Sequence, residues 1–429
     1  MLERLEAAGV GVRFVQDADM LAAIAAAIDH WDFAIDALLG TGAEGEPHGI
    51  VRDGCLLLNS LREHGTRVLA ADLPTGVDAT DGHIAPDAVH ADATVTFGHP
   101  RRGHWLWPGR ELCGTLDVVD IGLVTPEQAG VRPAALASAR ELARLVPVRE
   151  SRAHKGVAGR ALIVGGAPGM TGAMVLAAQA AARSGAGYVR VAAPASLQAA
   201  LAAHLVEPMV LACGEDEHRT LTSAALPLIL AEAELANAVA VGPGLARHPH
   251  AGVLARELVT RLARPLVLDA DALYALSPAA ELLVPALQPA PAPRILTPHL
   301  GEMQRLTGVS AQELEAHRID AAQEWAKRWG VVVVLKGAPT VVAAPDGRVS
   351  VNPTGSSALA TAGTGDVLTG ILVALLAQGL PPYDAARLAA FAHGLAGEQA
   401  AHDIGDLGVV ASDLIARIPS ALTRIRAAK

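Results

Sequence analysis

The chain has 429 residues, of which 51% are hydrophobic and 18% are charged, so it can bury the cores of two domains, and extensive disorder is excluded. The formal net charge of -10 argues against nucleic acid as a partner, and no apolar run has the length of a membrane span. The three cysteines, Cys55, Cys113 and Cys213, are far apart and form no CxxC motif, which fits a reducing cytoplasm and predicts neither a disulfide framework nor a zinc site.

The first part of the chain alternates short apolar runs with turn signals, which is typical of an α/β domain. Strands are expected at residues 33–39, 68–73, 93–97 and 116–121, and a helix is expected from Ile50 to His64. Residues 125–153 are rich in Ala, Pro and Arg. We interpret them as a linker followed by an initial helix of the next domain, from Ala134 to Leu145.

The second part of the chain is a longer α/β block. Buried strands are expected at residues 161–164, 188–192, 238–241, 265–268, 294–296 and 331–335. Helical segments alternate with these strands, which indicates parallel βαβ units. A hairpin with Asp346-Gly347 at its turn is expected near the end of the series.

Glycine and polar residues gather directly after these strands. In an open α/β sheet the ligand crevice lies outside the carboxyl ends of the strands, so these segments are expected to meet at one edge of the sheet. The residues are Gly165-Gly166, Gly242-Pro243-Gly244, Asp269, Asp271, Thr297, His299 and Lys336-Gly337.

A small-residue loop that leads into a helix is the strongest single signal. Gly363-Thr364-Gly365-Asp366 follows the segment Asn352-Pro353-Thr354-Gly355 and precedes an apolar stripe that ends at Gly379. Backbone N–H groups at a helix N-terminus suit a phosphate, and a carboxylate beside them can accept a proton. Asp366 could instead cap its helix, but the surrounding glycines favour a phosphoryl-transfer site.

Two other glycine-rich turns are less specific. Gly165 to Ala173 ends without the Gly-Lys-Ser/Thr of a P-loop, so a ligand-facing turn and tight strand–helix packing are equally good interpretations. The segment Gly242-Pro243-Gly244 has Arg247 where a dinucleotide fingerprint has its third glycine, which disfavours a conventional Rossmann site.

The charged residues after the strands also have alternatives. Asp269 and Asp271 could share one face and hold Mg²⁺, or one of them could cap the following helix. Taken alone, His299 fits a turn, whereas Lys336 follows four valines and is expected to face a site. Two further short segments are interpreted as parts of solvated loops. They are Arg101-Arg102 and His248-Pro249-His250.

From about Ala134 to Lys429 the sequence closely resembles the ADP/ATP-dependent NAD(P)H-hydrate dehydratases, a branch of the ribokinase-like superfamily. The resemblance implies a ribokinase-like αβα fold for the C-terminal domain. Two positions depart from the family pattern, with Tyr274 in place of Asn and Leu300 in place of Pro. The matching motifs are His154-Lys155-Gly156, Gly165 to Ala173, Ser184-Gly185-Ala186-Gly187, Gly242-Pro243-Gly244, Asp269 to Leu273, Thr297-Pro298-His299, Gly301-Glu302, Leu335 to Ala338, Asn352 to Gly355 and Gly363 to Gly370.

Residues 1 to about 128 resemble the C-terminal part of an NAD(P)H-hydrate epimerase domain, a partial Rossmann-like α/β domain, through Asp36 to Gly42 and Asp72 to Gly76. The family's Asn-Asn-Gly-Gly-Asp-Gly segment does not precede them here, and Arg101 or Arg102 stands where lysine is commoner. Both departures argue against epimerase activity, and a mis-set start codon would explain why the segment does not precede them. The expected domains are 1–128 (epimerase-like), 129–150 (linker and initial helix) and 151–429 (dehydratase).

The resemblance implies a repair reaction, in which ADP (or ATP) with Mg²⁺ phosphorylates the ring hydroxyl of (6S)-NAD(P)H hydrate. Loss of phosphate then restores NAD(P)H and leaves AMP. Asp366 is implied as the base. The implied substrate-binding residues are Ala173, Gly244, His299 and Asp366, and the implied nucleotide-binding residues are Lys336, Gly337, Ala338, Pro339, Thr340, Gly363, Thr364 and Gly365.

In the epimerase-like part the resemblance implies a second substrate site and a potassium ion held by Asp36 and Thr75. The implied contacts with the substrate are Gly40, Thr41, Gly42, Ala43, Glu44, Gly45, Glu46 and Asp72. The expected partners are small molecules only, NAD(P)H hydrate and an adenine nucleotide, with neither nucleic acid nor membrane. A homo-oligomer in the cytoplasm is expected.

Two other classes of function compete with this hypothesis. A ribokinase-like kinase of a small alcohol, such as a thiazole or a hydroxymethylpyrimidine, would use the same Asp366 but release its phosphorylated product. A nucleotide-binding regulator without catalysis is disfavoured, because both Asp366 and Lys336 are present.

Overall fold

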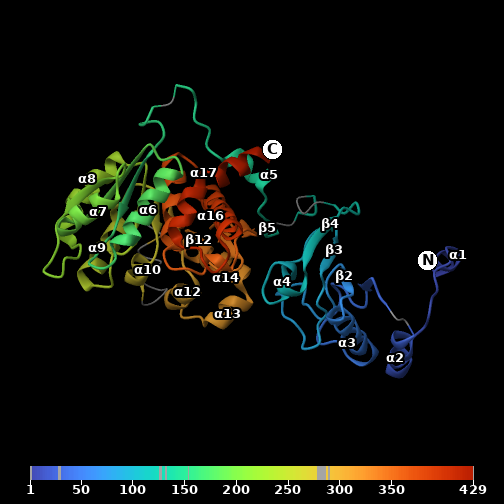
Figure 1. The fold of residues 1–429 in the computed structure, drawn as a ribbon. Helices are drawn as coiled ribbons and strands as arrows, with labels where there is room; N and C mark the ends of the chain where they lie inside the picture. Colours follow the sequence, from blue (N-terminus) through green and yellow to red (C-terminus); the bar gives the residue numbers. More distant parts are fainter. Residues whose placement is uncertain are drawn as a thin grey trace. The chain divides into compact units, whose positions relative to one another are not determined.

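The computed structural model describes residues 2–27, 30–124, 128–130, 133–152, 154–277, 287 and 290–428. The chain divides into two compact units, Met1–Val131 and Arg132–Lys429. Each unit contains one β-sheet with helices packed against it (Figure 1). Among the described residues, no helix is both long enough and apolar enough to cross a membrane.

The first unit contains a four-stranded parallel sheet in the order β1-β2-β3-β4. Cys55 and Leu58 of one helix pack against Ala34 and Val68 of the sheet. The strands are β1 (Phe33–Asp36), β2 (Arg67–Ala71), β3 (Ala93–Phe97) and β4 (Thr115–Val119). The helical segments are α1 (Leu2–Ala7), α2 (Ala18–Ala26), α3 (Gly49–Glu63), the 3-10 turn η1 (Arg102–His104) and α4 (Gly109–Leu112). All four predicted strands and the predicted helix at α3 are confirmed, although β1, β2 and β4 end earlier than expected.

The second unit contains a ten-stranded sheet in the order β5-β14-β13-β12-β11-β10-β9-β6-β7-β8. Every neighbouring pair is parallel except the two that include β13, so the hairpin predicted at Asp346-Gly347 is confirmed as β13–β14. The strands are β5 (Ala135–Leu136), β6 (Arg160–Val164), β7 (Tyr188–Pro194), β8 (Met209–Cys213), β9 (Ala238–Val241), β10 (Leu266–Leu268), β11 (Arg294–Leu296), β12 (Val332–Leu335), β13 (Thr340–Ala343) and β14 (Val349–Asn352).

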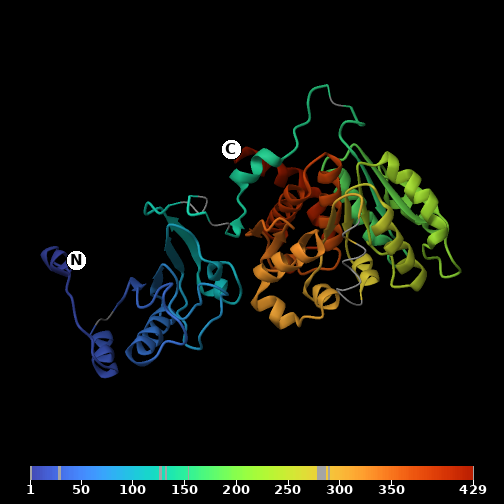
Figure 2. The ribbon, with the colours of Figure 1, turned by 180° about the vertical axis from the view of Figure 1, so that it is seen from behind.

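Helices cover both faces of this sheet, which gives the three-layer αβα arrangement expected from the sequence (Figures 1 and 2). The largest apolar cluster joins one face to α6 (Thr171–Arg183), α15 (Thr364–Ala377), α16 (Pro382–Ile404) and α17 (Ala411–Ala427). Other helices, including α8 (Leu226–Leu235) on β6 and α14 (Arg318–Trp329) on β12, contact the sheet outside this cluster. The remaining α-helices are α5 (Ala139–Leu142), α7 (Gln198–His204), α9 (Pro249–Arg261), α10 (Asp271–Leu276), α12 (Leu300–Thr307) and α13 (Ala311–Ala316).

The initial helix predicted from Ala134 to Leu145 is wrong in its first part. Residues Ala135–Leu136 form β5, which pairs in parallel with Ser350 and Val351 of β14. The edge of β14 offers unpaired backbone groups, and pairing with it satisfies them. The helix α5 begins only after Ser138, whose hydroxyl accepts a hydrogen bond from the Glu141 N–H. This segment therefore belongs to the second sheet rather than to a linker.

Helix α15 begins directly at the predicted loop and is more deeply buried than its apolar stripe suggested. Every residue from Val367 to Ala377 is buried. A Cβ atom added at Gly370 would lie 2.2 Å from the carbonyl oxygen of Ala177 in α6. The absence of a side chain at Gly370 therefore lets α15 and α6 approach closely, and this contact fixes where the N-terminus of α15 lies.

Candidate functional site

The buried carboxylate of Asp269, at the carboxyl end of β10, joins several strand ends. Its Oδ1 accepts hydrogen bonds from Lys336 Nζ at 2.9 Å and from Thr297 Oγ1 at 2.8 Å. Its Oδ2 accepts one from Thr369 Oγ1 of α15 at 2.7 Å. Burial opposes ionisation, but the Lys336 charge and these hydrogen bonds hold the pKa of Asp269 below its usual value. The prediction that these strand ends meet at one edge of the sheet is confirmed here.

Asp269 and Asp271 do not form the shared metal-binding face considered from their spacing. Ala270 between them has φ of 49°, so the segment is not extended, and Asp271 begins α10. The Asp271 carboxylate accepts hydrogen bonds from the Ala246 N–H at 3.0 Å and from Arg247 Nε at 3.2 Å. The two carboxylates therefore interact with different protein groups, and both oxygens of each already have donors.

Lys336 lies between three carboxylates. Its ammonium group contacts Asp269, and its Nζ is 3.9 Å from Glu302 Oε2. Burial would lower the pKa of Lys336, but the negative charges of Asp269 and Glu302 raise it overall, with a further contribution from Asp366. A Cβ added at Gly365 would be 3.4 Å from Nζ, so this cation lies beside the start of α15.

Arg318 of α14 donates hydrogen bonds to the backbone of the loop that follows Lys336. The buried guanidinium donates to the carbonyl oxygens of Lys336 and Pro339, each at 3.3 Å, and pairs with Glu315. Gly337 has φ of 150° and lies against the guanidinium, where an added Cβ would be 2.5 Å from Nη1. Arg318 has no distinguishing local signal, because its neighbours on α14 give an ordinary amphipathic pattern.

Asp366 occupies the third position of α15 and does not cap the helix, because the N-cap is Gly363 in a left-handed conformation. Within the described part of the chain the carboxylate accepts no hydrogen bond. Burial and the nearby Asp269 charge raise its pKa from 3.8 to about 7, although Lys336 acts in the opposite direction. Asp366 is thus a carboxylate that is poised to exchange a proton near neutral pH.

The start of α15 is supported by a buried histidine. His393 Nε2 lies 2.9 Å from the Thr364 carbonyl oxygen, and burial lowers the His393 pKa to about 4. The ring is therefore neutral at pH 7, and its N–H donates to that carbonyl. The Asn352-Pro353-Thr354-Gly355 segment packs on α16 instead, where Asn352 and Thr354 bond to the carbonyl oxygens of Ala390 and Phe391. Asn352 and Thr354 therefore attach their loop to α16.

The predicted glycine turns pack against one another. A Cβ at Gly165 would lie 2.2 Å from the Pro243 carbonyl oxygen, and a Cβ at Gly242 would lie 1.8 Å from that of Asp269. Gly244, with φ of 57°, is close to the backbone of Met170 and to Ala173. The packing interpretation of Gly165 is therefore correct, while Gly244 and Ala173 are neighbours, as expected of two residues in one site.

His299 is the N-cap of α12, with Glu302 completing a capping box. Its Nδ1 accepts from the N–H groups of Gly301 and Glu302, so a proton on the ring is carried by Nε2, which faces Glu302 Oε1 at 3.5 Å. Burial and the positive charge of Lys336 lower the His299 pKa. The turn interpretation is borne out by this geometry, and His299 also pairs through its backbone with Lys336.

The first unit has a pocket of 150 Å³ at the carboxyl end of its sheet. The lining residues include Gly40, Ala43, Gly45, Glu46 and Thr75, all of which sequence analysis had placed in a site. The others are Leu39, Leu73, Pro74, Gly76, Val77, Asp78, His83 and Ala85. Thr41, Gly42 and Glu44 belong to the same loop but do not line the pocket.

Asp36 and Thr75 are neighbours in this unit. The buried Asp36 carboxylate accepts hydrogen bonds from the Thr75 N–H and hydroxyl, each at 2.7 Å. Burial raises the pKa of Asp36, although these hydrogen bonds oppose the shift. The Asp36 carboxylate and the Thr75 hydroxyl are the hard oxygen groups that an alkali cation prefers.

Asp72 lies beside Gly40. A Cβ atom added at Gly40 would be 3.6 Å from Asp72 Oδ2. Its carboxylate accepts from Thr96 Oγ1 at 2.9 Å, and Arg101 Nη2 is 3.9 Å away. The buried His104 contacts the Asp72 carbonyl oxygen at 2.7 Å. Arg101 is therefore not a purely solvated residue as predicted, and His104 is a buried residue that sequence analysis did not identify.

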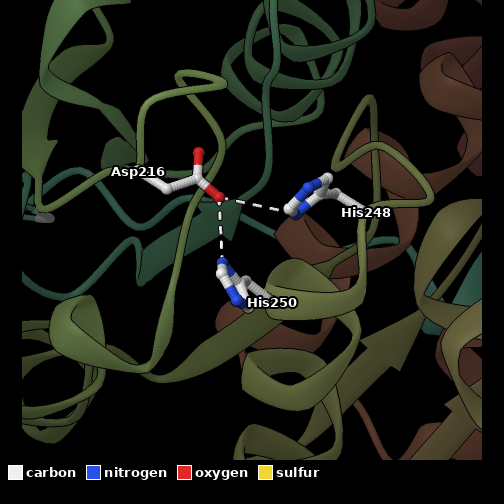
Figure 3. A group of neighbouring side chains, drawn as sticks. All are labelled: Asp216, His248 and His250. Carbon is white, nitrogen blue, oxygen red and sulfur yellow. Dashed lines mark hydrogen bonds and ion pairs between the residues drawn. The ribbon is translucent and has the colours of Figure 1, made fainter.

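A second group of histidines was also missed. His248 and His250, predicted to be solvated, both face the Asp216 carboxylate (Figure 3). Their partner is distant in sequence and stands in an unremarkable acidic segment, so no local signal could have found it.

A comparison with known families gives matches in both units. Residues 161–420 match the family described as NAD(P)H-hydrate dehydratase. Residues 1–103 match the family described as YjeF-related protein N-terminus.

Individual relatives agree with these families. The bifunctional NAD(P)H-hydrate repair enzyme Nnr of Moorella thermoacetica is 40% identical over 92% of this chain and 73% of its own length. The enzyme of the same description from Salinibacter ruber is 40% identical over 98% of this chain and 78% of its own length. The ADP/ATP-dependent NAD(P)H-hydrate dehydratase of Bacillus subtilis, co-crystallized with ATP and Mg²⁺, superimposes with a TM-score of 0.58 at 31% identity, covering 68% of this chain and 99% of that chain.

The αβα sheet of the second unit, with its glycine loop and Asp366 at the start of α15, defines a ribokinase-like enzyme that carries an additional α/β unit at its N-terminus. The relatives identify the family within this class of enzymes. The chain belongs to the bifunctional NAD(P)H-hydrate repair enzymes, and the resemblance seen in the sequence is confirmed.

Proposed function

We propose that the second unit catalyses the ADP-dependent dehydration of (6S)-NAD(P)H hydrate to NAD(P)H, with AMP and phosphate as the other products. One observation carries the proposal: Asp366, with a pKa of about 7, lies next to the start of a helix and close to the Lys336 cation. The relatives described above support the choice of substrate over the small alcohols of a ribokinase-like kinase.

The residues of the site have distinct roles in this reaction. Asp366 accepts the proton of the ring hydroxyl as the hydroxyl oxygen attacks the terminal phosphorus of ADP. The N–H groups of Gly365 and Asp366, at the start of α15, and the Lys336 ammonium stabilise the negative charge of the transferring group. The phosphate ester then loses phosphate, which takes the electrons of its C–O bond. The adjacent ring carbon releases a proton to water, and the electrons of that C–H bond form the ring double bond.

The nucleotide and the hydrate bind to neighbouring loops in this proposal. The nucleotide contacts residues 336–340 and 363–365, and the hydrate contacts Ala173, Gly244 and His299. Mg²⁺, which accompanies ATP in the Bacillus subtilis structure, would neutralise phosphate charge. Asp269 and Asp271 already accept hydrogen bonds from protein donors on both oxygens, whereas Asp366 accepts none within the described part of the chain.

For the first unit we infer that a nicotinamide nucleotide binds at the pocket lined by Gly40, Ala43, Gly45 and Glu46, with Asp72 beside Gly40. Asp36 and Thr75 are the inferred ligands of a potassium ion, because Thr75 lines that pocket and the buried Asp36 carboxylate is hydrogen-bonded to Thr75. The relatives are described as bifunctional, and substrate binding is the part of an epimerase activity that the pocket supports. A cytoplasmic homo-oligomer remains a prediction.

The test is to supply (6S)-NADH hydrate, ADP and Mg²⁺ to the purified chain and to follow NADH absorbance together with AMP and phosphate. We expect the three products in equal amounts, and no phosphate when the hydrate is omitted. Phosphorylation of a thiazole or hydroxymethylpyrimidine alcohol, without recovery of NADH, would reject the dehydratase in favour of the kinase.

A further inference from the structure

Three side chains from two loops of the second unit converge on one point at the carboxyl ends of β8 and β9 (Figure 3). Asp216 follows β8, while His248 and His250 lie at the start of α9, with His248 as its N-cap. One potential ligand atom from each residue lies within 4.8 Å of the other two. None of these residues belongs to the dehydratase site proposed above.

The spacing of these atoms resembles that of a metal site. Asp216 Oδ2 is 3.1 Å from His250 Nδ1 and 3.4 Å from His248 Nδ1. In a tetrahedral zinc site with bonds of about 2.0–2.1 Å, neighbouring ligand atoms are roughly 3.4 Å apart. A cation could therefore bind between the carboxylate and both imidazoles with only small side-chain rotations.

Hydrogen bonds within the protein leave one nitrogen of the Asp216–His248–His250 cluster without a partner. His250 Nδ1 can donate to Asp216 Oδ2, but His248 Nδ1, which is buried and faces the same oxygen, has no hydrogen-bond partner. Although Asp216 Oδ2 is 3.4 Å from His248 Nδ1, the two atoms do not have the geometry of a hydrogen bond, so the buried Nδ1 is unsatisfied whether or not it carries a proton. A cation that accepts electron pairs from all three atoms would satisfy this nitrogen.

The surroundings fix the carboxylate in place. Asp216 Oδ1 accepts hydrogen bonds from the Thr220 N–H at 2.9 Å and from the His218 N–H at 3.1 Å, and the Thr220 hydroxyl lies 3.0 Å from Oδ1 and 2.9 Å from Oδ2. The Asp216 side chain is 6% exposed, whereas that of His250 is 59% exposed. The carboxylate is thus oriented by neighbouring donors, as metal-binding carboxylates usually are, and a path from solvent to the site is open.

We propose that Asp216, His248 and His250 form a binding site for a divalent transition metal ion of the zinc class, with water completing the coordination. Two neutral imidazoles and one carboxylate are ligands that such ions prefer. The positive end of the α9 dipole opposes the bound cation, and the Asp216 charge offsets it. The bound ion would attach the end of the β9–α9 loop to Asp216. Asp271 already accepts hydrogen bonds from Ala246 and Arg247 of the same loop.

The test uses the full-length, untagged chain, freed of metal and titrated with Zn²⁺ against a chromophoric chelator. We expect one tightly bound ion per chain and a Co²⁺ derivative with visible d–d absorption. His248→Ala and His250→Ala should each weaken Zn²⁺ binding about tenfold or more, as loss of a ligand should cost at least as much as loss of an outer-shell partner. Zn²⁺ should also raise the melting temperature of the wild type but not that of His250→Ala.

His402→Ala is the matched control, because His402 is an exposed histidine 3.5 Å from Asp403, outside the cluster. It should bind Zn²⁺ as the wild type does. Both histidine variants are checked for an unchanged circular dichroism spectrum, and Asp216→Asn is not used because Asp216 also organises its turn. Absence of stoichiometric binding, or equal binding by wild type and both variants, would overturn the proposal.

Discussion

Asp269 and Asp366 are two carboxylates near one ammonium group, and their environments shift their pKa values in opposite directions. Asp269 has direct hydrogen bonds from Lys336 and two threonines, so its pKa is lowered despite burial. Asp366 is buried without such donors and close to the Asp269 charge, so its pKa rises to about 7. Two carboxylates with separated pKa values often divide the roles of charge holder and base. On this reasoning Asp269 orients Lys336, and Asp366 exchanges the proton.

Asp366→Asn should reduce dehydratase turnover by roughly 10²- to 10⁴-fold, because the amide cannot accept the hydroxyl proton. ADP binding, measured by calorimetry, should change little, since the helix start and Lys336 remain. Asp117→Asn, which neutralises an exposed carboxylate on β4 of the first unit, is the control and should leave both quantities unchanged. Full turnover in Asp366→Asn would rule out the proposed base.

The pH dependence of the reaction should report the same group. Below pH 7 Asp366 is largely protonated and cannot act as a base, so log kcat/KM should rise with pH and level off above about 7. Lys336→Gln should move the inflection to higher pH, because the lysine charge lowers the Asp366 pKa. A profile that is flat between pH 5 and 8 would contradict this assignment.

At the level of elements, two supports determine where the reacting groups lie. The close contact of α6 with α15 sets the position of the Asp366 helix, and Arg318 of α14 holds the loop at 336–340. Neither support touches the proposed substrates. Their removal should therefore alter stability or nucleotide affinity rather than the proton transfer itself.

Gly370→Ala should destabilise the second unit by about 1–3 kcal/mol, because the new methyl group would overlap the Ala177 carbonyl of α6. Chemical denaturation measures this difference. Gly172→Ala is the matched control, since Gly172 also lies in a helix but its added methyl has nothing within 4 Å. It should be neutral or stabilising by up to about 1 kcal/mol. Equal effects of the two changes would show that helix packing is not responsible.

Arg318→Ala should leave the carbonyl groups of Lys336 and Pro339 without their buried donor, at a cost of about 1–3 kcal/mol for each unpaired group. We expect ADP affinity to fall about tenfold or more as the loop shifts, with calorimetry as the measurement. Lys327→Ala on the exposed side of the same helix should bind ADP normally. Unchanged ADP affinity in Arg318→Ala would contradict the proposal that the loop at 336–340 binds the nucleotide.

At the level of the whole molecule, the division between the units falls earlier than the end of the predicted linker. The first unit ends at Val131, and residues 135–145 pack within the second unit. Buried Arg387 of α16 forms a salt bridge with Glu141 of α5 in addition to a 3.7 Å contact with Asp384. The segment is thus part of the dehydratase fold.

A fragment that starts at Arg132 should fold and retain ADP-dependent dehydratase activity, whereas one that starts at Ser151 should be less stable by several kcal/mol. The shorter fragment exposes the edge of β14 and leaves the buried Arg387 without Glu141. Thermal unfolding and the NADH-recovery assay measure both properties. Equal melting temperatures would show that β5 and α5 are dispensable.

Most strands of both sheets could be predicted, because runs such as Ala238–Val241 are wholly apolar and end in glycine or polar residues. The two strands that were missed lie at the edges of the larger sheet. β5 has only two residues, too few for any periodicity, and β8 (Met209–Cys213) is only partly buried. The burial of α15 on all sides could not be predicted either, because three other helices and the sheet surround it.

Local patterns along the chain were sufficient to locate the glycine turns, the carboxyl ends of the strands and the position of Asp366 at the start of a helix, because these depend on neighbouring residues. The partners of those groups depend on tertiary structure. Lys336 reaches Asp269 across 67 residues, Thr369 reaches it across 100, and His250 reaches Asp216 across 34. Burial and charge–charge energy depend on distances in space, so the raised pKa of Asp366 and the Asp216–His248–His250 cluster exist only in the folded chain.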